Sequence, residues 1–396
     1  MRLATLDVAR GLALLGVALV NVHAFAVGWD SHRAIERAAH AGDLLFEWVI
    51  GFLVQGRAYP VLAFLLGLGL ALQWRRAGNP TDPTESSQTL GLMRRRLWAL
   101  FAIGVLHGLL LWPGDILASY ALIGLAVLWR WPRTTDEMRR WVLIAAGLFV
   151  AANAVIIAGY LFMPPAPLPA SVSSFAERDV LSALAHHPLE FVFYGLVHLS
   201  LPQLWALTAA GVWLAPCVMA WLHTGAPWNR WLRLAALGML LSLASELIAL
   251  AAGQWTYQLT SSPEAAWLIV AQAVAAPASP PLVLWLAARW SATPAPGLLR
   301  QLAEAAGRTP LTQFIGQSVI FVLIFSGWAF GWHGAIGRGA YSLIALVAWA
   351  ALAAFGRAWL GAGHSRGPME WLWHRCALAS VSRRQPQPPR CGGREP

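Results

Sequence analysis

The sequence contains no lysine, because all 28 basic residues among its 396 are arginines. A chain without lysine cannot form a lysine Schiff base, and it cannot supply the lysine of a Walker-type phosphate loop. Charge of either sign is scarce: charged residues make up 12% of the chain, against roughly 25% in soluble domains. Hydrophobic residues make up 58%. A soluble protein of this composition could not cover its own surface, so the sequence predicts an integral membrane protein whose partner is the lipid bilayer.

Cysteine is also rare, with Cys217, Cys376 and Cys391 widely spaced and odd in number. This pattern favours neither a disulfide framework nor a metal site. The adjacent His186 and His187 lack a third ligand at a suitable spacing, so no metal is predicted. The net charge of +10 comes from arginines in short clusters between apolar runs. Such clusters are typical of cytoplasmic loops rather than of a nucleic-acid-binding face, and no nucleic-acid partner is predicted.

About ten apolar runs approach the length that a helix needs to cross the hydrocarbon core of a bilayer. They cover residues 8–28, 44–74, 97–113, 115–131, 141–163, 193–222, 234–253, 266–288, 310–328 and 340–358. The run 44–74 is too long for one straight span, and Arg57 and Pro60 interrupt it, which predicts a broken helix. The run 193–222 is also overlong, and we expect its first part to lie along the interface. The fold class that follows is all-α, a polytopic transmembrane helical bundle.

Arginines gather in alternate loops when the ten runs are threaded through a membrane. One side holds the arginine clusters of loops 75–96, 132–140, 223–233 and 289–309 and of the tail. The opposite side keeps only four, which are Arg33, Arg37, Arg178 and Arg338. The positive-inside rule therefore predicts that both termini are cytoplasmic.

The N-terminal residues imitate a signal peptide, with Arg2 and Arg10 before an apolar stretch. Because Arg10, Asn21 and His23 are costly polar residues for a disposable segment, we expect the first helix to be retained. Residues 1–382 are predicted to form a single transmembrane domain. The tail 383–396, rich in Pro, Arg and Gly, is predicted to be disordered and cytoplasmic.

Several stretches stand out for the order of their polar and small residues. They are 2–16 (RLATLDVARGLALLG), 55–69, 107–117 (HGLLLWPGDIL) with Tyr120, 307–318 and 367–373 (GPMEWLW). They resemble the corresponding segments of the YeiB family, bacterial polytopic membrane proteins that carry a domain of unknown function. The resemblance covers nearly the whole chain, and its motifs lie in the N-terminal helices of residues 1–131 and in a C-terminal region, 310–374. One departure is Thr309–Gln313, where the family more usually has a small apolar residue and then an Asn-Tyr pair.

The family resemblance implies a more distant one, to membrane acyltransferases. These include the heparan glucosaminide N-acetyltransferase type and the O-acyltransferases of bacterial envelopes, which open with a similar Leu-Asp-x-x-Arg-Gly run. They move an acyl group from cytoplasmic acyl-CoA to a carbohydrate-like acceptor. Many of the O-acyltransferases place a histidine about eleven residues after the arginine, whereas this chain has Asn21 there and His23 two residues on. The resemblance implies a bacterial inner-membrane protein with acyl-CoA as donor substrate and no firmly implied cofactor.

Ionisable side chains within apolar runs are expensive at bilayer depth, so they usually face a cavity, a partner or a functional site. The candidate site contains His23 or His107 as a general base, Asp115 as the group that orients it, and Arg10, Asn21 and Arg57 for substrate binding. We predict that the ionisable members border one cavity through the first four helices. The alternative is that each pairs separately with its own neighbour, Arg10 with Asp7 for example, and that Asp115 caps the following helix.

Two other functional classes compete with the enzyme. In a small-molecule transporter or exporter, Arg10, Arg57 and Glu246 would line the translocation path. A non-catalytic membrane component is the third possibility. An inverted repeat with paired broken helices, the usual sign of alternating access, is not evident in the sequence. The sequence predicts no oligomeric state.

Overall fold

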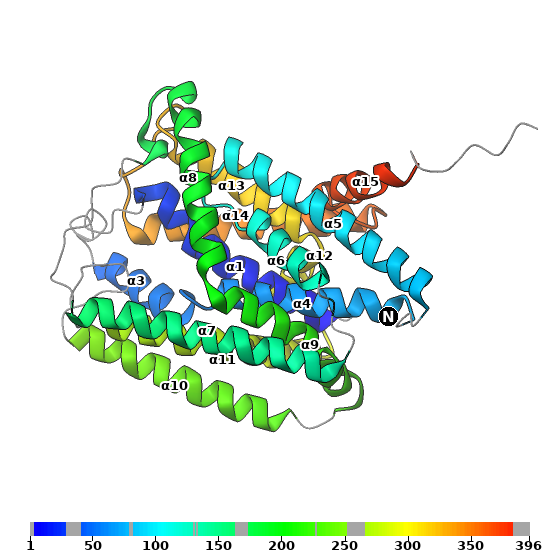
Figure 1. Ribbon diagram of the computed structural model, residues 1–396. Helices are drawn as coiled ribbons and strands as arrows, with labels where there is room; N and C mark the ends of the chain where they lie inside the picture. The colour runs from blue at the N-terminus through cyan, green and yellow to red at the C-terminus, as the bar shows by residue number, and fades with distance from the viewer. Residues whose placement is uncertain are drawn as a thin grey trace, which may run out of the picture.

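The structure is a computed structural model that describes residues 4–28, 41–78, 82–129, 131, 134–162, 173–225, 228–251 and 266–382. Within these ranges every regular element is a helix, as Figure 1 shows. This confirms the expected all-α polytopic bundle for the described residues. Apolar runs take this form because the bilayer interior offers no hydrogen-bond partners to the backbone. A helix satisfies its backbone N–H and C=O groups within the segment itself. The predicted tail 383–396 lies outside the described residues.

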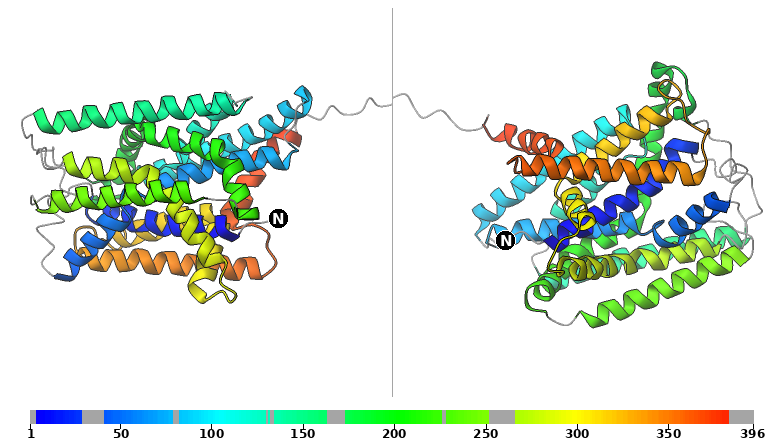
Figure 2. Two further views of the ribbon diagram at one scale, coloured as in Figure 1. Left: turned by 90° about the horizontal axis from the view of Figure 1, so that it is seen from below. Right: turned by 180° about the vertical axis from the view of Figure 1, so that it is seen from behind.

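The described elements are α-helices and one 3-10 helix. The first half of the chain contains α1 (Ala4–Val27), α3 (Ala41–Leu53), α4 (Ala58–Arg76), α5 (Pro83–Leu110), α6 (Leu117–Trp129), α7 (Thr135–Phe162), the 3-10 helix η1 (Ser174–Ala176) and α8 (Val180–Ser200). The second half contains α9 (Pro202–Thr224), α10 (Asn229–Ala251), α11 (Ala266–Ser291), α12 (Leu298–Arg308), α13 (Pro310–Phe325), α14 (Arg338–Gly361) and α15 (Pro368–Ser382). The N-terminus and α15 lie at the same side of the structure in all views (Figures 1 and 2).

Eight helices of the described chain are long and apolar enough to cross a membrane, or nine if a bent pair counts as one span. The bent pair is α12 and α13, which meet at 97°. The expected number was about ten. The run 115–131 became α6, whose 13 residues are fewer than the roughly 20 that a span needs. The run 97–113 is only the second half of α5, whose first half is polar.

The two overlong runs are both interrupted. The run 44–74 breaks between α3 and α4, as predicted, and Gly56 adopts the left-handed φ of 69° at the break. The run 193–222 divides into α8 and α9, because Pro202 starts a new helix at its first position. Figure 1 shows α8 running across the direction of α7, α10 and α11.

Helix α1 is the most deeply buried of the candidate spans and packs against α4, α11, α12, α13 and α14. It approaches α12 so closely that two glycines are required. A Cβ atom on Gly307 would lie 1.7 Å from the carbonyl oxygen of Asp7, and one on Gly11 would lie 1.9 Å from that of Ala303. Small residues allow membrane helices to come this close. The contact joins the segments 2–16 and 307–318, so packing explains part of their pattern.

Replacement of Gly307 by alanine is expected to destabilise the protein by about 1–3 kcal/mol, since the added methyl group forces α1 and α12 apart. The matched control is Gly69→Ala in α4, where a Cβ atom would have no neighbour within 4 Å. There the better helix propensity of alanine should raise stability by about 0.5–1 kcal/mol. Thermal unfolding of both variants in one detergent measures the difference. Equal midpoints would contradict the close contact.

Candidate functional site

The connection between α5 and α6 brings together the two residues of the strongest local motif. The Nδ1 atom of His107 lies 2.8 Å from Oδ1 of Asp115. The other carboxylate oxygen, Oδ2, accepts a hydrogen bond of 2.8 Å from the backbone N–H of Ala118 in the first turn of α6. Asp115 therefore caps α6 and orients His107 at the same time. Both side chains are buried, with exposed fractions of 1% and 0%.

The remaining ring nitrogen of His107 distinguishes this histidine from a purely structural one. Because the Asp115 carboxylate accepts from Nδ1, the proton of a neutral His107 is assigned to Nδ1 and the lone pair to Nε2. Nε2 is buried and has no hydrogen-bond partner among the described residues. The rings of Phe314 and Trp112 pack beside it, with centroids 5.1 and 6.4 Å from that of the imidazole. The arrangement presents a basic nitrogen in apolar surroundings.

His23, the other candidate base, lies in a different environment. Its Nδ1 atom is 2.6 Å from Nη1 of Arg338 and 2.9 Å from the hydroxyl of Tyr341. A guanidinium can only donate, so Nδ1 of His23 is an acceptor and the imidazole is neutral. All three side chains are buried. Sequence reasoning missed Arg338 as a partner because it counted this arginine only as a loop residue; its place at the start of an apolar run was the available signal.

Asn21 also has a defined partner. Its side-chain oxygen accepts a hydrogen bond from the hydroxyl of Tyr59. The backbone oxygen of Tyr59 in turn accepts a bond of 2.7 Å from the hydroxyl of Tyr120. Asn21, the 55–69 segment and Tyr120 are therefore linked across α1, α4 and α6.

Arg10 is paired within its own helix. Its Nη1 atom lies 2.7 Å from Oδ1 of Asp7, and it also donates a bond of 3.1 Å to the carbonyl of Gly307. This is the i,i+3 ion pair that the sequence offered as an alternative. The Arg10 side chain is 30% exposed, so part of it stays accessible in the N-terminal part of α1.

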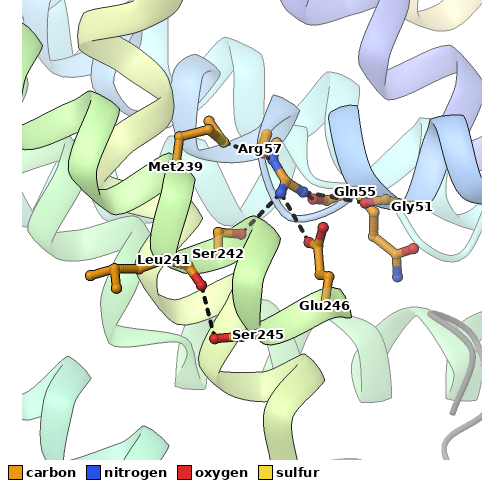
Figure 3. A network of polar contacts seen from close by, with 8 residues as sticks. All are labelled: Gly51, Gln55, Arg57, Met239, Leu241, Ser242, Ser245 and Glu246. Carbon is orange, nitrogen blue, oxygen red and sulfur yellow. Dashed lines mark hydrogen bonds and ion pairs between the residues drawn. The ribbon is translucent and has the colours of Figure 1, made fainter. Parts of the chain in front are cut away.

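Arg57 stands at the break between α3 and α4 and reaches α10 (Figure 3). Its Nη2 atom donates to Oε1 of Glu246 at 2.9 Å and to the hydroxyl of Ser242 at 3.0 Å. Its Nη1 atom donates to the carbonyls of Gln55 and Gly51, at 2.7 and 3.3 Å. The carbonyl groups come from the interrupted turn. The break thus supplies acceptors for the arginine, and the ion pair joins two buried side chains.

The structure brings His107 and Asp115 into direct contact. It places Arg10, His23 and Arg57 in separate contacts, each with its own partner. The pairwise arrangement matches the alternative that the sequence left open. A single cavity lined by all five stays a prediction.

The two C-terminal motifs also meet, through Glu370. Its Oε1 atom accepts from the backbone N–H groups of Leu311 and Thr312, at 2.5 and 3.0 Å, and its Oε2 atom accepts from the Thr312 hydroxyl at 2.7 Å. A carboxylate at a helix N-terminus satisfies free donors and interacts favourably with the helix dipole. Glu370 therefore holds the start of α13 against α15. The departure from the family pattern at Thr309–Gln313 includes Thr312, whose backbone N–H and hydroxyl both bond to Glu370.

Residues 219–380 match a family described as a protein of unknown function, DUF418. This part of the chain is therefore similar to DUF418 proteins. It is 22% identical to the uncharacterized protein YxaH of Bacillus subtilis, over 96% of this chain and 95% of that one. It is 31% identical to an uncharacterized 39.9 kDa protein of Bacillus acidopullulyticus, over 49% of this chain and 51% of the relative. It is 28% identical to the uncharacterized protein YeiB of Escherichia coli, over 39% and 37%. The resemblance to the YeiB family is confirmed.

The DUF418 match and the candidate site overlap only in part. The matched region contains α10 to α14 and most of α15, and hence Glu246, Arg338, Tyr341 and Glu370. The His107–Asp115 pair lies before it, in the part of the chain that the similarity to YxaH also covers. The DUF418 domain thus supplies partners for α1 and α4, while the acid–base pair belongs to the N-terminal helices.

Proposed function

We propose that this chain is a bacterial inner-membrane acyltransferase that moves an acyl group from cytoplasmic acyl-CoA to an envelope acceptor. The observation that supports it is the buried His107–Asp115 pair with the free Nε2 atom of His107. In the proposed reaction Nε2 takes the proton of an acceptor hydroxyl, and the hydroxyl oxygen attacks the thioester carbonyl. The C–S bond breaks, and the thiolate of CoA receives the proton from Nε2. Asp115 keeps the Nδ1 proton in place and stabilises the imidazolium between the two transfers.

The geometry assigns different roles to the two histidines in this proposal. His107 is the base, because its free nitrogen carries the lone pair. His23 instead contributes to substrate binding in this proposal, because its accepting nitrogen is already bonded to Arg338. Arg10 lies in the N-terminal part of α1, and the exposed part of its side chain contacts the donor phosphate in this proposal.

Binding of acyl-CoA is the first test of the proposed function. Acetyl-CoA and longer acyl-CoAs are expected to raise the thermal midpoint of the purified protein, because a ligand that binds only the native state adds about 2.7 kcal/mol at one hundred times its Kd. Release of the CoA thiol, with transfer of radiolabelled acyl groups to a panel of sugars, would then identify the acceptor. 3′-Phosphoadenosine diphosphate is the control for simple phosphate binding. Absence of both stabilisation and thiol release would contradict the proposal.

Transport is the second candidate, and one observation favours it. The span Trp48–Arg76 is broken where Arg57 pairs with Glu246, and α12 and α13 form a second interrupted segment bent by 97°. Interrupted helices at bilayer depth often bind substrates in transporters. Solute uptake by proteoliposomes without acyl-CoA, abolished by Glu246→Gln, would favour this candidate over the enzyme.

In the proposed orientation both termini lie on the cytoplasmic side of the bacterial inner membrane. The end of α4, which carries Arg75 and Arg76, lies on the side of the N-terminus (Figure 1), whereas η1 contacts the far ends of α1 and α13. In a variant without native cysteines, Arg178→Cys is expected to react with an impermeant maleimide on spheroplasts. Glu85→Cys should react only after the membrane is permeabilised. Labelling of Glu85→Cys from outside would reverse the orientation.

A further inference from the structure

A cavity of about 390 Å³ lies between α6, α7 and the junction of α8 with α9. Its walls are mostly apolar, and they include Trp129, Met138, Ala145, Pro202 and Ala209. The volume falls within the range of small-molecule sites. A cavity with so few polar groups holds water poorly, so its natural occupant is apolar.

The cavity opens beside an exposed apolar surface of α7. None of the residues in the most apolar stretch of α7 is buried, and Leu143, Ile144 and Leu148 are each about 60% exposed. Two of these, Ile144 and Leu148, also line the cavity. The lipid-facing surface of α7 therefore continues into the cavity, and a hydrocarbon chain can pass from one to the other.

The end of the cavity at Trp129 and Met138 lies near the level expected for lipid head groups. Helix α6 ends there, α7 begins after a short connection, and tryptophans gather at such interfaces. Arg94 of α5 is exposed and donates a hydrogen bond of 3.4 Å to the carbonyl of Leu128, next to Trp129. Its guanidinium is therefore available for a phosphate at this end.

The other end of the cavity reaches the junction of α8 and α9. Trp205 donates its indole N–H to the carbonyl of Leu199 at 2.9 Å, so the ring offers the cavity an apolar face. The cavity is therefore apolar at the Trp205 end, and Arg94 lies near its opposite end.

We propose that this cavity binds one acyl chain of a bilayer phospholipid, whose phosphate lies near Arg94. The inference is independent of the proposed acyl transfer, because it concerns a lipid site between α6, α7 and α9. Three features together favour a phospholipid: the apolar walls, their continuity with the exposed face of α7, and the basic side chain at the head-group end.

A phospholipid with a diazirine in one acyl chain tests the proposal in nanodiscs of the full chain. Met138 and Ala209 are 4% and 6% exposed, so lipid that merely surrounds the protein cannot reach them. Mass spectrometry is expected to find cross-links at these two residues. Cross-links confined to exposed positions such as Leu143 would overturn the proposal.

Variants with a larger side chain in the cavity test whether the cross-links depend on the cavity being open. Ala145→Phe should reduce labelling of Ala209 about tenfold, the effect of a clash that costs 1.4 kcal/mol. Ala154→Phe, on the exposed face of the same helix, should leave it unchanged. Ala209→Phe, read out at Met138, replaces the first variant if that one does not fold. Equal labelling in parent and filled variants would refute the site.

A competition arm identifies the source of the chain. Excess unlabelled phospholipid should displace the probe, and a long-chain acyl-CoA should not. Displacement by acyl-CoA alone would overturn the assignment to phospholipid and make the cavity part of a donor site. Acyl-transfer activity plays no part in either readout, so a failure of this proposal is distinguishable from a failure of the proposed function.

Discussion

Asp115→Asn is expected to lower the rate of acyl transfer by about 10³- to 10⁴-fold while leaving the fold intact. Asparagine can still accept the N–H of Ala118 and cap α6. It can no longer hold the proton of His107 on Nδ1 or stabilise the imidazolium. The change therefore separates the orienting role of Asp115 from its capping role. Turnover of labelled acyl-CoA at saturating acceptor is the measurement.

Two further variants make this result interpretable. His107→Gln should lose a similar factor, and the double variant should be no worse than either single one, since the two residues act as a unit. His187→Gln is the matched control: His187 is also buried and contacts the carbonyl of Leu109 at 3.1 Å, but it does not contact Asp115. Normal turnover in Asp115→Asn, or an equal loss in His187→Gln, would remove the acid–base role.

Glu246→Ala is expected to destabilise the protein by about 3–5 kcal/mol, because it leaves the buried guanidinium of Arg57 without a counter-charge. The double variant Arg57→Met, Glu246→Leu should recover much of this stability, since an apolar pair removes both charges. Ser242→Ala is the smaller change, because it removes one hydrogen bond and costs about 1 kcal/mol. Thermal and denaturant unfolding in one detergent would measure all three.

The same series distinguishes a structural ion pair from a transport site. A recovered fold with normal acyl transfer in the double variant would show that the pair serves stability alone. A recovered fold with lost solute uptake would point to transport. If Glu246→Ala unfolds at the temperature of the parent, the ion pair carries no stabilising role.

The membrane class and the helical fold follow from composition and from the length of the apolar runs. These are local properties, since the bilayer forces each run to satisfy its own backbone. The break near Arg57 was also local, because a charge, a glycine and a proline occur within six residues. The division of the run 193–222 into α8 and α9 at Pro202 was harder to predict. A proline at the first position of a helix and one inside it look alike in a sequence until the neighbours are known.

The His107–Asp115 pair could be predicted because eight residues and one turn separate the two side chains. By contrast, Arg57 and Glu246 are 189 residues apart, and His23 and Arg338 are 315 apart. No periodicity or spacing relates residues so distant. The sequence by itself determined which ionisable side chains lie within apolar helices. The tertiary structure alone decided their partners, because each buried charge is stabilised by whichever helix packing brings against it.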